Sequence, residues 1–308
     1  MLMYVVRRLL QAVPVVIGTT FLIYFMVFSM PGDPILAMFG DKTPSPALYD
    51  QLAAQYHLDQ PFLVQYGLYM KDLFTGNLGT TFSGESVGAV LSRTFPVTLK
   101  LASMAIAIEF CVAVVLGLFA GLRKGKFFDN LTLVIGLIML SVPIFVLCFL
   151  AQYFIAIKWG WASPTVGADT SFSNMLLPAI VLAASLFTTS MRLMRGTVID
   201  TRSRDFVRTA YAKGLPGRRV IPVHVLRNSL IPVVTNSAAN FGVLMVGATV
   251  TEGIFNVPGV GNTLYQAIIR GEGPTVVSFV TVMVLAYVAI NILVDLLYAV
   301  LDPRIRYA

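Results

Sequence analysis

SRDFVRTAYAKGLPGRRVIPVHVLR, residues 203–227, is the most basic stretch of a chain whose 308 residues are 57% hydrophobic and only 12% charged. Soluble domains carry about 25% charged residues, so this composition is typical of an integral membrane protein. The stretch predicts a short helix with Ser203 as its N-cap, Lys213 in its last turn and Gly214 just beyond its end. A cationic helical segment between two membrane spans is expected to contact lipid headgroups or a protein partner.

The predicted helix has an apolar side and a polar side. Helical spacing of i and i+4 brings its apolar residues together on one face, while its polar residues point elsewhere. The apolar face is expected to hold Phe206, Val207, Ala210 and Tyr211, and the remaining surface Arg204, Arg208 and Thr209.

Six apolar runs surround this stretch, and each approaches or exceeds the 20 or so residues that a helix needs to cross a bilayer. We therefore predict an all-α integral membrane fold, a single domain of residues 1–308 with six transmembrane helices. Residues 31–95 are expected to form an extracytoplasmic insertion with short helices, and residues 251–274 an outer loop. Residues 203–227 are expected to form a cytoplasmic loop between the fourth and fifth spans. The six spans are residues 9–30, 96–122, 131–157, 175–194, 229–250 and 275–301.

The distribution of basic residues predicts the orientation. Of the 22 Lys and Arg residues, two precede the first span, three follow the second, nine lie between Arg192 and Arg227, and two lie in the C-terminal tail. These 16 residues all fall on one side of the predicted topology, and the positive-inside rule makes that side cytoplasmic. Both termini are therefore expected in the cytoplasm. The same skew accounts for the net charge of +7 without a nucleic-acid partner.

The sequence contains no motif of an enzyme or of a metal site. A P-loop, an HExxH sequence and a GxSxG sequence are all absent. His57 and His224 lie far apart in the sequence. Cys111 and Cys148 lie inside apolar runs, as expected of small buried hydrophobic residues. We therefore predict no catalytic residue, no metal and no directly bound cofactor. If the protein moves a solute uphill, a partner must supply the energy.

Several polar residues fall inside the predicted spans. A charge at the bilayer centre costs at least about 2.5–3.5 kcal/mol, so Glu109 and Asp295 are expected to face protein or water. The fifth span carries a stripe of amide and small residues, which serves either close helix packing or a polar pathway. Both interpretations stay open for every one of these residues. The candidates for a translocation path are Glu109, Ser141, Thr189, Asn236 and Asn240.

The basic stretch resembles the cytoplasmic "EAA" loop of ABC importer permeases. Residues 208–214 fit the variant RTAxAKG, which is similar to the peptide and nickel branch of that family. The match departs from the general motif at Arg208, which replaces its Glu, and at His224 and Arg227, which replace its Ile and Pro. The sequence HxLRN at residues 224–228 fits the peptide branch instead. The sequences PGDP at residues 31–34 and GNLG at residues 76–79 resemble its B-type subunit.

This resemblance covers nearly the whole chain and implies roles for two sets of residues. In permeases of this kind the cytoplasmic helix contacts the ATPase, and a segment close to ExIFxxPGxGxL contacts the binding protein at the outer mouth. The implied ATPase contacts are Arg204, Phe206, Arg208, Thr209, Ala210, Tyr211 and Gly214, and the implied binding-protein contacts are Glu252, Phe255, Asn256, Pro258, Gly259 and Gly261.

The resemblance implies a permease subunit for di- or oligopeptides in a bacterial or archaeal cytoplasmic membrane. Its partners would be a second, similar permease, two ATPase subunits that bind ATP and Mg²⁺, an extracytoplasmic solute-binding protein, the peptide substrate and membrane lipid. A nickel or haem importer of the same family is an alternative. From another class, a channel or a proton-coupled transporter that uses Glu109 or Asp295 is a further alternative, and there the basic loop would bind only anionic lipid.

Overall fold

The computed structural model describes residues 2–28, 34–39, 43–81 and 83–301. Residues 31–33 of the PGDP sequence and the C-terminal DPR sequence lie outside the described residues. The chain divides into two compact units, and each is described here by itself. The first unit comprises Leu99–Val257 and the chain from Ile290 onward, and the second comprises Leu2–Thr98 and Pro258–Ala289.

The second unit carries the short helices that were expected after the first span. Ser45 caps the start of one of them. Its hydroxyl accepts a hydrogen bond from the Leu48 amide, and a proline follows it at the first helical position. The rings of Phe21 and Tyr66, 5.2 Å apart, join the first span to a second short helix. The helices of this unit are α1 (Leu2–Phe28), α2 (Pro34–Phe39), α3 (Pro46–Gln55), α4 (Phe62–Phe74), the start of α5 (Val87–Leu122), α12 (Val260–Ile269) and the start of α13 (Gly273–Leu301).

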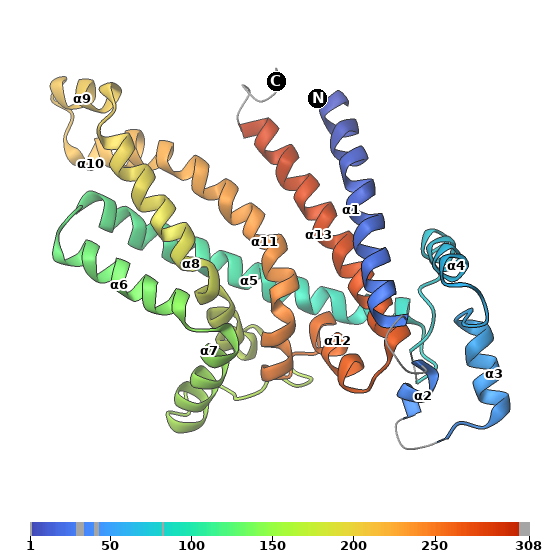
Figure 1. Ribbon diagram of the computed structural model, residues 1–308. Coiled ribbons are helices and arrows are strands. Elements are labelled where there is room, and N and C mark those ends of the chain that lie inside the picture. The colour runs from blue at the N-terminus through green and yellow to red at the C-terminus, as the bar shows by residue number, and fades with distance from the viewer. Residues whose placement is uncertain (1, 29–33, 40–42, 82, 302–308) are drawn as a thin grey trace. The chain divides into compact units, whose positions relative to one another are not determined.

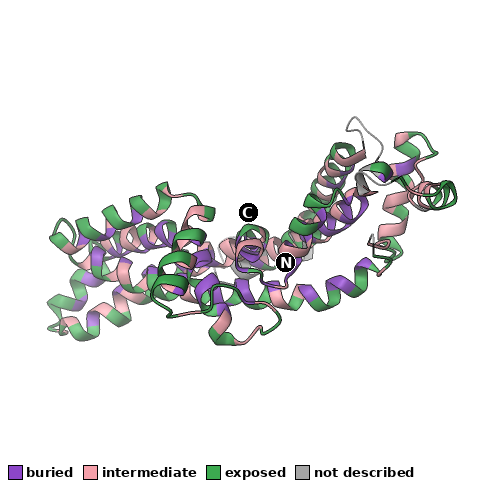
Figure 2. Cartoon of the chain, turned by 90° about the horizontal axis from the view of Figure 1, so that it is seen from below, coloured by how far each residue is buried: buried purple, intermediate pink, exposed green. Residues whose placement is uncertain are grey.

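The first unit holds the remaining helices. Figure 1 shows α8 and α11 side by side over much of their length, and their buried faces form the centre of the unit. Buried and exposed positions alternate along these long helices in Figure 2, as expected when only one face of a helix packs against protein. These helices are α6 (Phe127–Ser141), α7 (Ile144–Ala151), the π-helix η1 (Gln152–Lys158), α8 (Phe172–Arg202), α9 (Asp205–Ala212), α10 (Gly217–Val220), the π-helix η2 (Ile221–Leu226) and α11 (Arg227–Phe255).

Two glycines allow α5 and α8 to approach closely. A Cβ atom added to Gly117 would lie 2.7 Å from the Met194 Cβ, and one added to Gly121 would lie 2.8 Å from the Val198 Cβ. The two glycines are four residues apart and therefore lie on one face of α5. This is the small-xxx-small spacing that membrane helices use to bring their backbones together.

Five helices of the described chain are long and apolar enough to cross a membrane, and a sixth span depends on a bent pair. We expected one continuous span over residues 131–157. In the structure α6 ends at Ser141, and the helix that starts at Ile144 turns away by 102°. Pro143 explains the break, because proline has no amide hydrogen to donate and because it forces Val142 into an extended conformation, with φ −90° and ψ 122°. The five helices are Val6–Phe28, Val87–Leu122, Phe172–Arg202, Gly217–Phe255 and Gly273–Val294.

Several helices extend beyond the boundaries that were expected for the membrane spans. The second span was expected to begin at residue 96, but α5 begins at Val87 and contains Pro96 in its interior. The fourth span was expected to end at residue 194, but α8 reaches Arg202, and after α9 helical structure resumes at Gly217, before the expected end of the loop at residue 227. The outer loop of residues 251–274 contains the whole of α12. Apolar runs mark only the membrane-crossing part of a helix, so they miss its polar extensions.

Candidate functional site

The helix predicted in the basic stretch is present as α9, but it begins differently from the prediction. Ser203 does not cap it. Ser203 ends α8 instead, where its hydroxyl donates a hydrogen bond of 2.7 Å to the carbonyl of Asp200. The residue before α9 is Arg204, in an extended conformation with ψ 148° and no side-chain cap. Only Ser203 and Arg204 separate the two helices, so α9 is tied closely to the end of α8.

The predicted end of α9 is confirmed. Gly214 has a φ of 81°, in the left-handed region that favours glycine. Its amide donates to the Tyr211 carbonyl at 2.9 Å, and the Leu215 amide donates to the Ala210 carbonyl at 3.2 Å. These two hydrogen bonds form a Schellman motif, which satisfies the last carbonyls of the helix and turns the chain sharply.

The faces of α9 are arranged differently from the expectation. Val207 and Ala210 are buried and pack onto a core that includes Val198, Val220 and Val225 of the same unit. Phe206 and Tyr211, which were expected beside them, are 45% and 48% exposed. With about 3.6 residues per turn, Phe206 and Tyr211 flank the buried pair from its two sides. Ala210 therefore faces its own chain, while two aromatic rings remain accessible at the surface.

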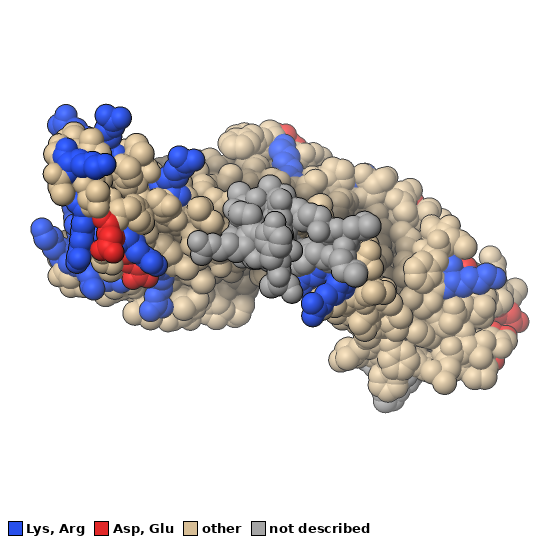
Figure 3. All heavy atoms as spheres, turned by 90° about the horizontal axis from the view of Figure 1, so that it is seen from above, with Lys and Arg blue, Asp and Glu red and all other residues tan. Residues whose placement is uncertain are grey.

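Basic side chains surround α9. The view from above in Figure 3 shows Lys and Arg atoms gathered over the part of the first unit that carries α9 and α10. Asp205 offsets little of this charge, since its contact with Arg208 is 3.9 Å long and both side chains are exposed. The exposed basic residues of this surface are Arg202, Arg204, Arg208, Lys213, Arg218, Arg219 and Arg227.

A cavity of about 300 Å³ lies beside the start of α9. Asp200 at the end of α8 and Asn228 at the start of α11 contribute polar groups to its lining. Arg204 and Phe206 also line it, so the residues that begin α9 stand next to open space. Thr209, another expected contact residue, is exposed and donates its hydroxyl hydrogen bond to the Asp205 carbonyl of its own helix.

A buried polar cluster joins α5, α8 and α11. Glu109 of α5 has no exposed surface, and its carboxylate accepts hydrogen bonds from the Ser237 hydroxyl at 3.0 Å and from the Asn240 amide at 3.5 Å. Ser190 of α8 accepts from the amides of Asn236 at 2.9 Å and Asn240 at 3.3 Å. Three of the five expected path residues, Glu109, Asn236 and Asn240, therefore meet in one place.

The other path candidates lie outside this cluster. The Ser141 hydroxyl donates to the Leu137 carbonyl of its own helix, and Thr189 is exposed. The residue that joins the cluster is Ser190, one position beyond Thr189 and so about 100° around the helix. Sequence spacing does not define the rotation of α8 about its axis, so it could not distinguish these neighbours. Asp295 lies in α13, but its side chain is outside the described part of the chain.

Ser237 also lines an apolar cavity of about 680 Å³ in the same unit. The walls of this cavity come from α5, α11 and the end of α13, and they include Phe110, Phe241 and Leu293. The Ser237 hydroxyl is thus shared between the wall of the cavity and the Glu109 cluster behind it.

The segment expected to contact a binding protein is a capped helix end in the first unit. Asn256 ends α11 in the left-handed conformation, with φ 49° and ψ 47°. The carbonyl groups of Phe255 and Asn256 accept hydrogen bonds from the amides of Val166 and Gly167, at 2.8 and 3.1 Å. Glu252 and Phe255 are fully buried, so their side chains pack inside this unit, whereas Asn256 is exposed.

The rest of this segment belongs to the second unit. Pro258 is partly buried, and Gly259 precedes α12 as its N-terminal cap residue. Gly261 is buried in the first turn of α12. The neighbouring amide of Val260 donates a hydrogen bond of 2.9 Å to the Thr98 hydroxyl, which ties this turn to α5.

Known protein families match both parts of the chain. A family described as the inner membrane component of binding-protein-dependent transport systems matches residues 113–307. A second family, described as the N-terminal part of the membrane component of such systems, matches residues 1–102.

Full-length relatives agree with these families. The chain is 33% identical to the dipeptide transport system permease protein DppB of Alkalihalophilus pseudofirmus, with 100% of both chains covered. It is 34% identical to DppB of Escherichia coli K12, with 100% of this chain and 99% of the relative covered. It is 33% identical to a putative peptide transport system permease protein of Brucella abortus, with 98% of both chains covered.

Proposed function

The chain belongs to the family of inner membrane components of binding-protein-dependent transport systems, and on this premise we propose that it is a permease subunit that carries di- or oligopeptides into the cell. It is a multi-pass protein of the cytoplasmic membrane. The main support for a peptide substrate is the similarity over the full length of the chain to relatives named as dipeptide permeases. The complete transporter would also hold a second, similar permease, two ATPase subunits and an extracytoplasmic binding protein.

The coupling element in this proposal is α9. Partner ATPase subunits would bind ATP and Mg²⁺ and would push on this helix when they close. The exposed rings of Phe206 and Tyr211 suit an apolar groove on such a partner, and Arg204 and Arg208 beside them suit acidic groups there. The buried side of α9 and its direct junction with α8 would carry the displacement into the membrane helices.

The translocation path in this proposal runs along the apolar cavity of the first unit. A mostly apolar wall with few polar groups suits peptides of varied sequence, because it demands no particular side chain. The Glu109 cluster lies behind Ser237 and would hold α5, α8 and α11 in register while the path opens alternately to the two sides. The outer turn that contains Asn256 and Pro258 would meet the loaded binding protein.

The proposal is tested by purification of the full-length chain with its partner subunits and measurement of ATP hydrolysis in proteoliposomes. A panel of dipeptides, longer peptides, nickel and haem, each supplied with the binding protein, should stimulate hydrolysis only for peptides. Stimulation by nickel or haem alone would assign the chain to another branch of the family. Peptide uptake driven by a proton gradient without ATP would favour a secondary transporter.

The same assay tests the role of α9. Phe206→Ala combined with Tyr211→Ala should lower peptide-stimulated hydrolysis and ATPase co-purification while the chain remains folded, because both rings are exposed. Val207→Ala is the matched control, since its side chain is buried in the unit and its loss should lower stability instead. Unchanged coupling in the double variant would contradict the assignment.

A further inference from the structure

The second unit contains a pocket that the proposed transport path does not use. It encloses about 150 Å³ and is lined by α1, α4, the turn after α3 and the start of α13. A buried cavity of this volume holds a benzene-sized molecule, or about six non-hydrogen atoms. The pocket is therefore large enough for one side chain or one terminal residue and too small for a whole peptide.

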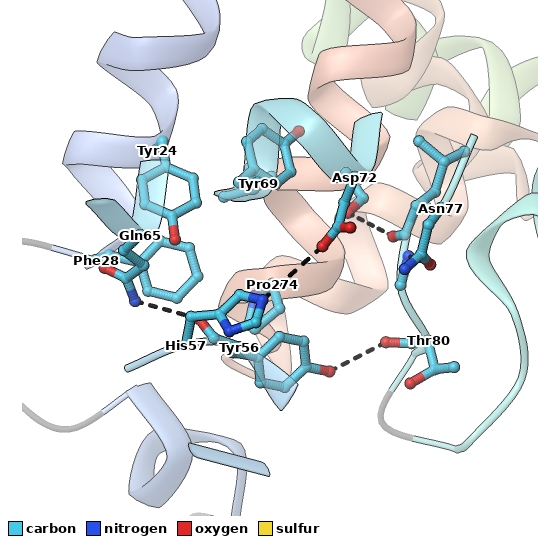
Figure 4. Close-up of a pocket in the computed structure, with 14 residues that line it drawn as sticks. Tyr24, Phe28, Tyr56, His57, Gln65, Tyr69, Asp72, Asn77, Thr80 and Pro274 are labelled. Atoms are coloured by element: carbon cyan, nitrogen blue, oxygen red, sulfur yellow. Dashed lines mark hydrogen bonds and ion pairs between the residues drawn. The ribbon is translucent and has the colours of Figure 1, made fainter. Parts of the chain in front are cut away.

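Aromatic residues form much of the pocket wall. Tyr24 and Phe28 come from α1, Tyr69 from α4 and Tyr56 from the turn after α3. The rings of Tyr24 and Tyr69 pack 5.1 Å apart. Figure 4 shows these residues around the ring of His57 and the carboxylate of Asp72. The negative faces of aromatic rings attract a cation.

Three hydrogen-bond donors of the wall already have partners. The Tyr56 hydroxyl donates to the Thr80 carbonyl at 3.1 Å, and the Tyr69 hydroxyl donates to the Thr281 hydroxyl at 2.7 Å. The Gln65 amide donates to the Tyr56 carbonyl at 3.3 Å. Burial raises the pKa of Tyr69 to about 12 and also raises the pKa of Tyr56, so both phenols stay neutral at physiological pH. Because their hydrogens are already engaged, the phenol oxygens of Tyr56 and Tyr69 act as acceptors toward a ligand.

The pocket is lined by a negatively charged side chain, as a binding site for a cation requires. Within the described chain, no Lys or Arg side chain lines the pocket, and Asp72 lies on its wall. Among the described residues that line the pocket, the basic group is the His57 ring, whose Nε2 is 4.0 Å from the Asp72 carboxylate. His57 has a φ of 54°, in a region that a side chain other than glycine adopts at a cost, and this conformation places its ring at the pocket.

From this combination we infer that the pocket binds a primary ammonium group on a short aliphatic chain. The Asp72 carboxylate accepts a charge-assisted hydrogen bond from the ammonium, the phenol oxygen of Tyr56 accepts a second one, and the rings of Tyr24, Phe28 and Tyr69 surround the methylene groups. Such a group is offered either by the amino terminus of a peptide or by a lysine side chain. This inference does not depend on the proposed transport function, because equilibrium binding requires neither ATP nor uptake.

The test uses the full-length protein in lipid nanodiscs with its co-purifying subunits and n-pentylammonium as the probe, measured by saturation-transfer NMR. The wild-type protein should bind the probe saturably and should bind neutral pentan-1-ol more weakly. Asp72→Asn should weaken binding of the ammonium about tenfold, the value of one lost charge-assisted hydrogen bond. Asp50→Asn is the matched control, since Asp50 is an exposed carboxylate on α3 outside the pocket lining, and it should bind as the wild type does.

A second variant and two competitors complete the test. Tyr56→Phe removes the phenol oxygen alone and should weaken binding less than Asp72→Asn does. Trialanine offers only a terminal ammonium and Nα-acetyl-lysine amide offers only a side-chain ammonium, so the one that displaces the probe identifies the source. The inference is overturned if the wild type does not bind the probe, if Asp72→Asn and Asp50→Asn bind it equally, or if N-acetyl-trialanine amide displaces it.

Discussion

Glu109 shows at the scale of one residue how a buried charge is accommodated in an apolar helix. Its carboxylate has no exposed surface, and a charge at the bilayer centre costs at least about 2.5–3.5 kcal/mol. Hydrogen bonds from Ser237 and Asn240 offset part of this cost and connect α5 to α11. The arrangement resembles a structural brace, whereas a proton carrier needs a carboxyl group that solvent reaches in at least one state.

The two roles predict different results for a conservative substitution. If Glu109 is a brace, Glu109→Gln should retain most of the uptake, because the amide oxygen still accepts a hydrogen bond. Glu109→Leu should lower the free energy of unfolding by about 1–3 kcal/mol, because it leaves the buried Ser237 hydroxyl without its carboxylate acceptor and removes one of the two acceptors of the Asn240 amide. Thermal unfolding and peptide uptake measure the two effects. Ser185→Ala is the control, since that hydroxyl donates to the Leu182 carbonyl of its own helix. Loss of all uptake in Glu109→Gln, with normal folding, would favour the proton-coupled alternative.

At the scale of whole helices, the first unit depends on how closely α5 and α8 approach. Gly117 and Gly121 stand directly against Met194 and Val198, with no space for a Cβ atom at either position. The neighbours there include the backbone carbonyls of Met191 and Arg195, which a side-chain rotation cannot move away. The contact therefore determines the separation of α5 from the helix that leads into α9.

Gly117→Val and Gly121→Val should each lower the free energy of unfolding by about 1–3 kcal/mol or more, because the added methyl groups force the two helices apart. Gly196→Ala is the matched control on α8, where a Cβ atom would meet nothing within 4 Å. That substitution should be neutral or slightly stabilising, since alanine is the better helix former. Chemical denaturation in detergent compares the three variants. Equal stability of all three variants would show that α5 and α8 are not in tight contact at Gly117 and Gly121.

At the scale of the whole molecule, the main open prediction is the orientation in the membrane. The basic residues at the α9 end and those after α5 should be cytoplasmic, and the segment between η1 and α8 should be extracytoplasmic. The break at Pro143 makes an experimental test necessary, because it leaves α6 and α7 as two short helices at 102° to each other. A continuous span there would have assigned the two sides without ambiguity.

Single cysteines test the orientation in a variant without the exposed thiol of Cys111. A cysteine at Ala168 should react with a membrane-impermeant reagent in intact cells, and cysteines at Lys126 and Asp200 should react only after permeabilisation. All three positions are exposed in the structure, so lack of reaction reports the membrane and not burial within the protein. Ala168 is preferred to its neighbour Asp169, which accepts hydrogen bonds from Ser171 and Asn174. Labelling at Asp200 in intact cells, without labelling at Ala168, would contradict the predicted topology and indicate the opposite orientation.

The sequence by itself determined the features that depend on local chemistry and on the bilayer. Its apolar runs located the membrane helices, because a lipid environment excludes long polar segments from such helices. The glycine at position 214 located the end of α9, because the left-handed turn there favours a residue without a Cβ atom. The similarity of residues 203–228 to a known loop correctly indicated the family.

Only the tertiary structure decided which residues meet. Sequence spacing placed Ala210 and Phe206 on one face of α9, but the packing against Val198 and Val220 buries the first and leaves the second at the surface. Sequence spacing also selected Thr189 as a path residue, but the rotation of α8 about its axis brings Ser190 to Asn236 instead. The physical reason is the same in both cases. Periodicity gives the relative angle of residues within one helix, whereas the rotation of that helix about its axis is set by contacts with residues far away in the chain.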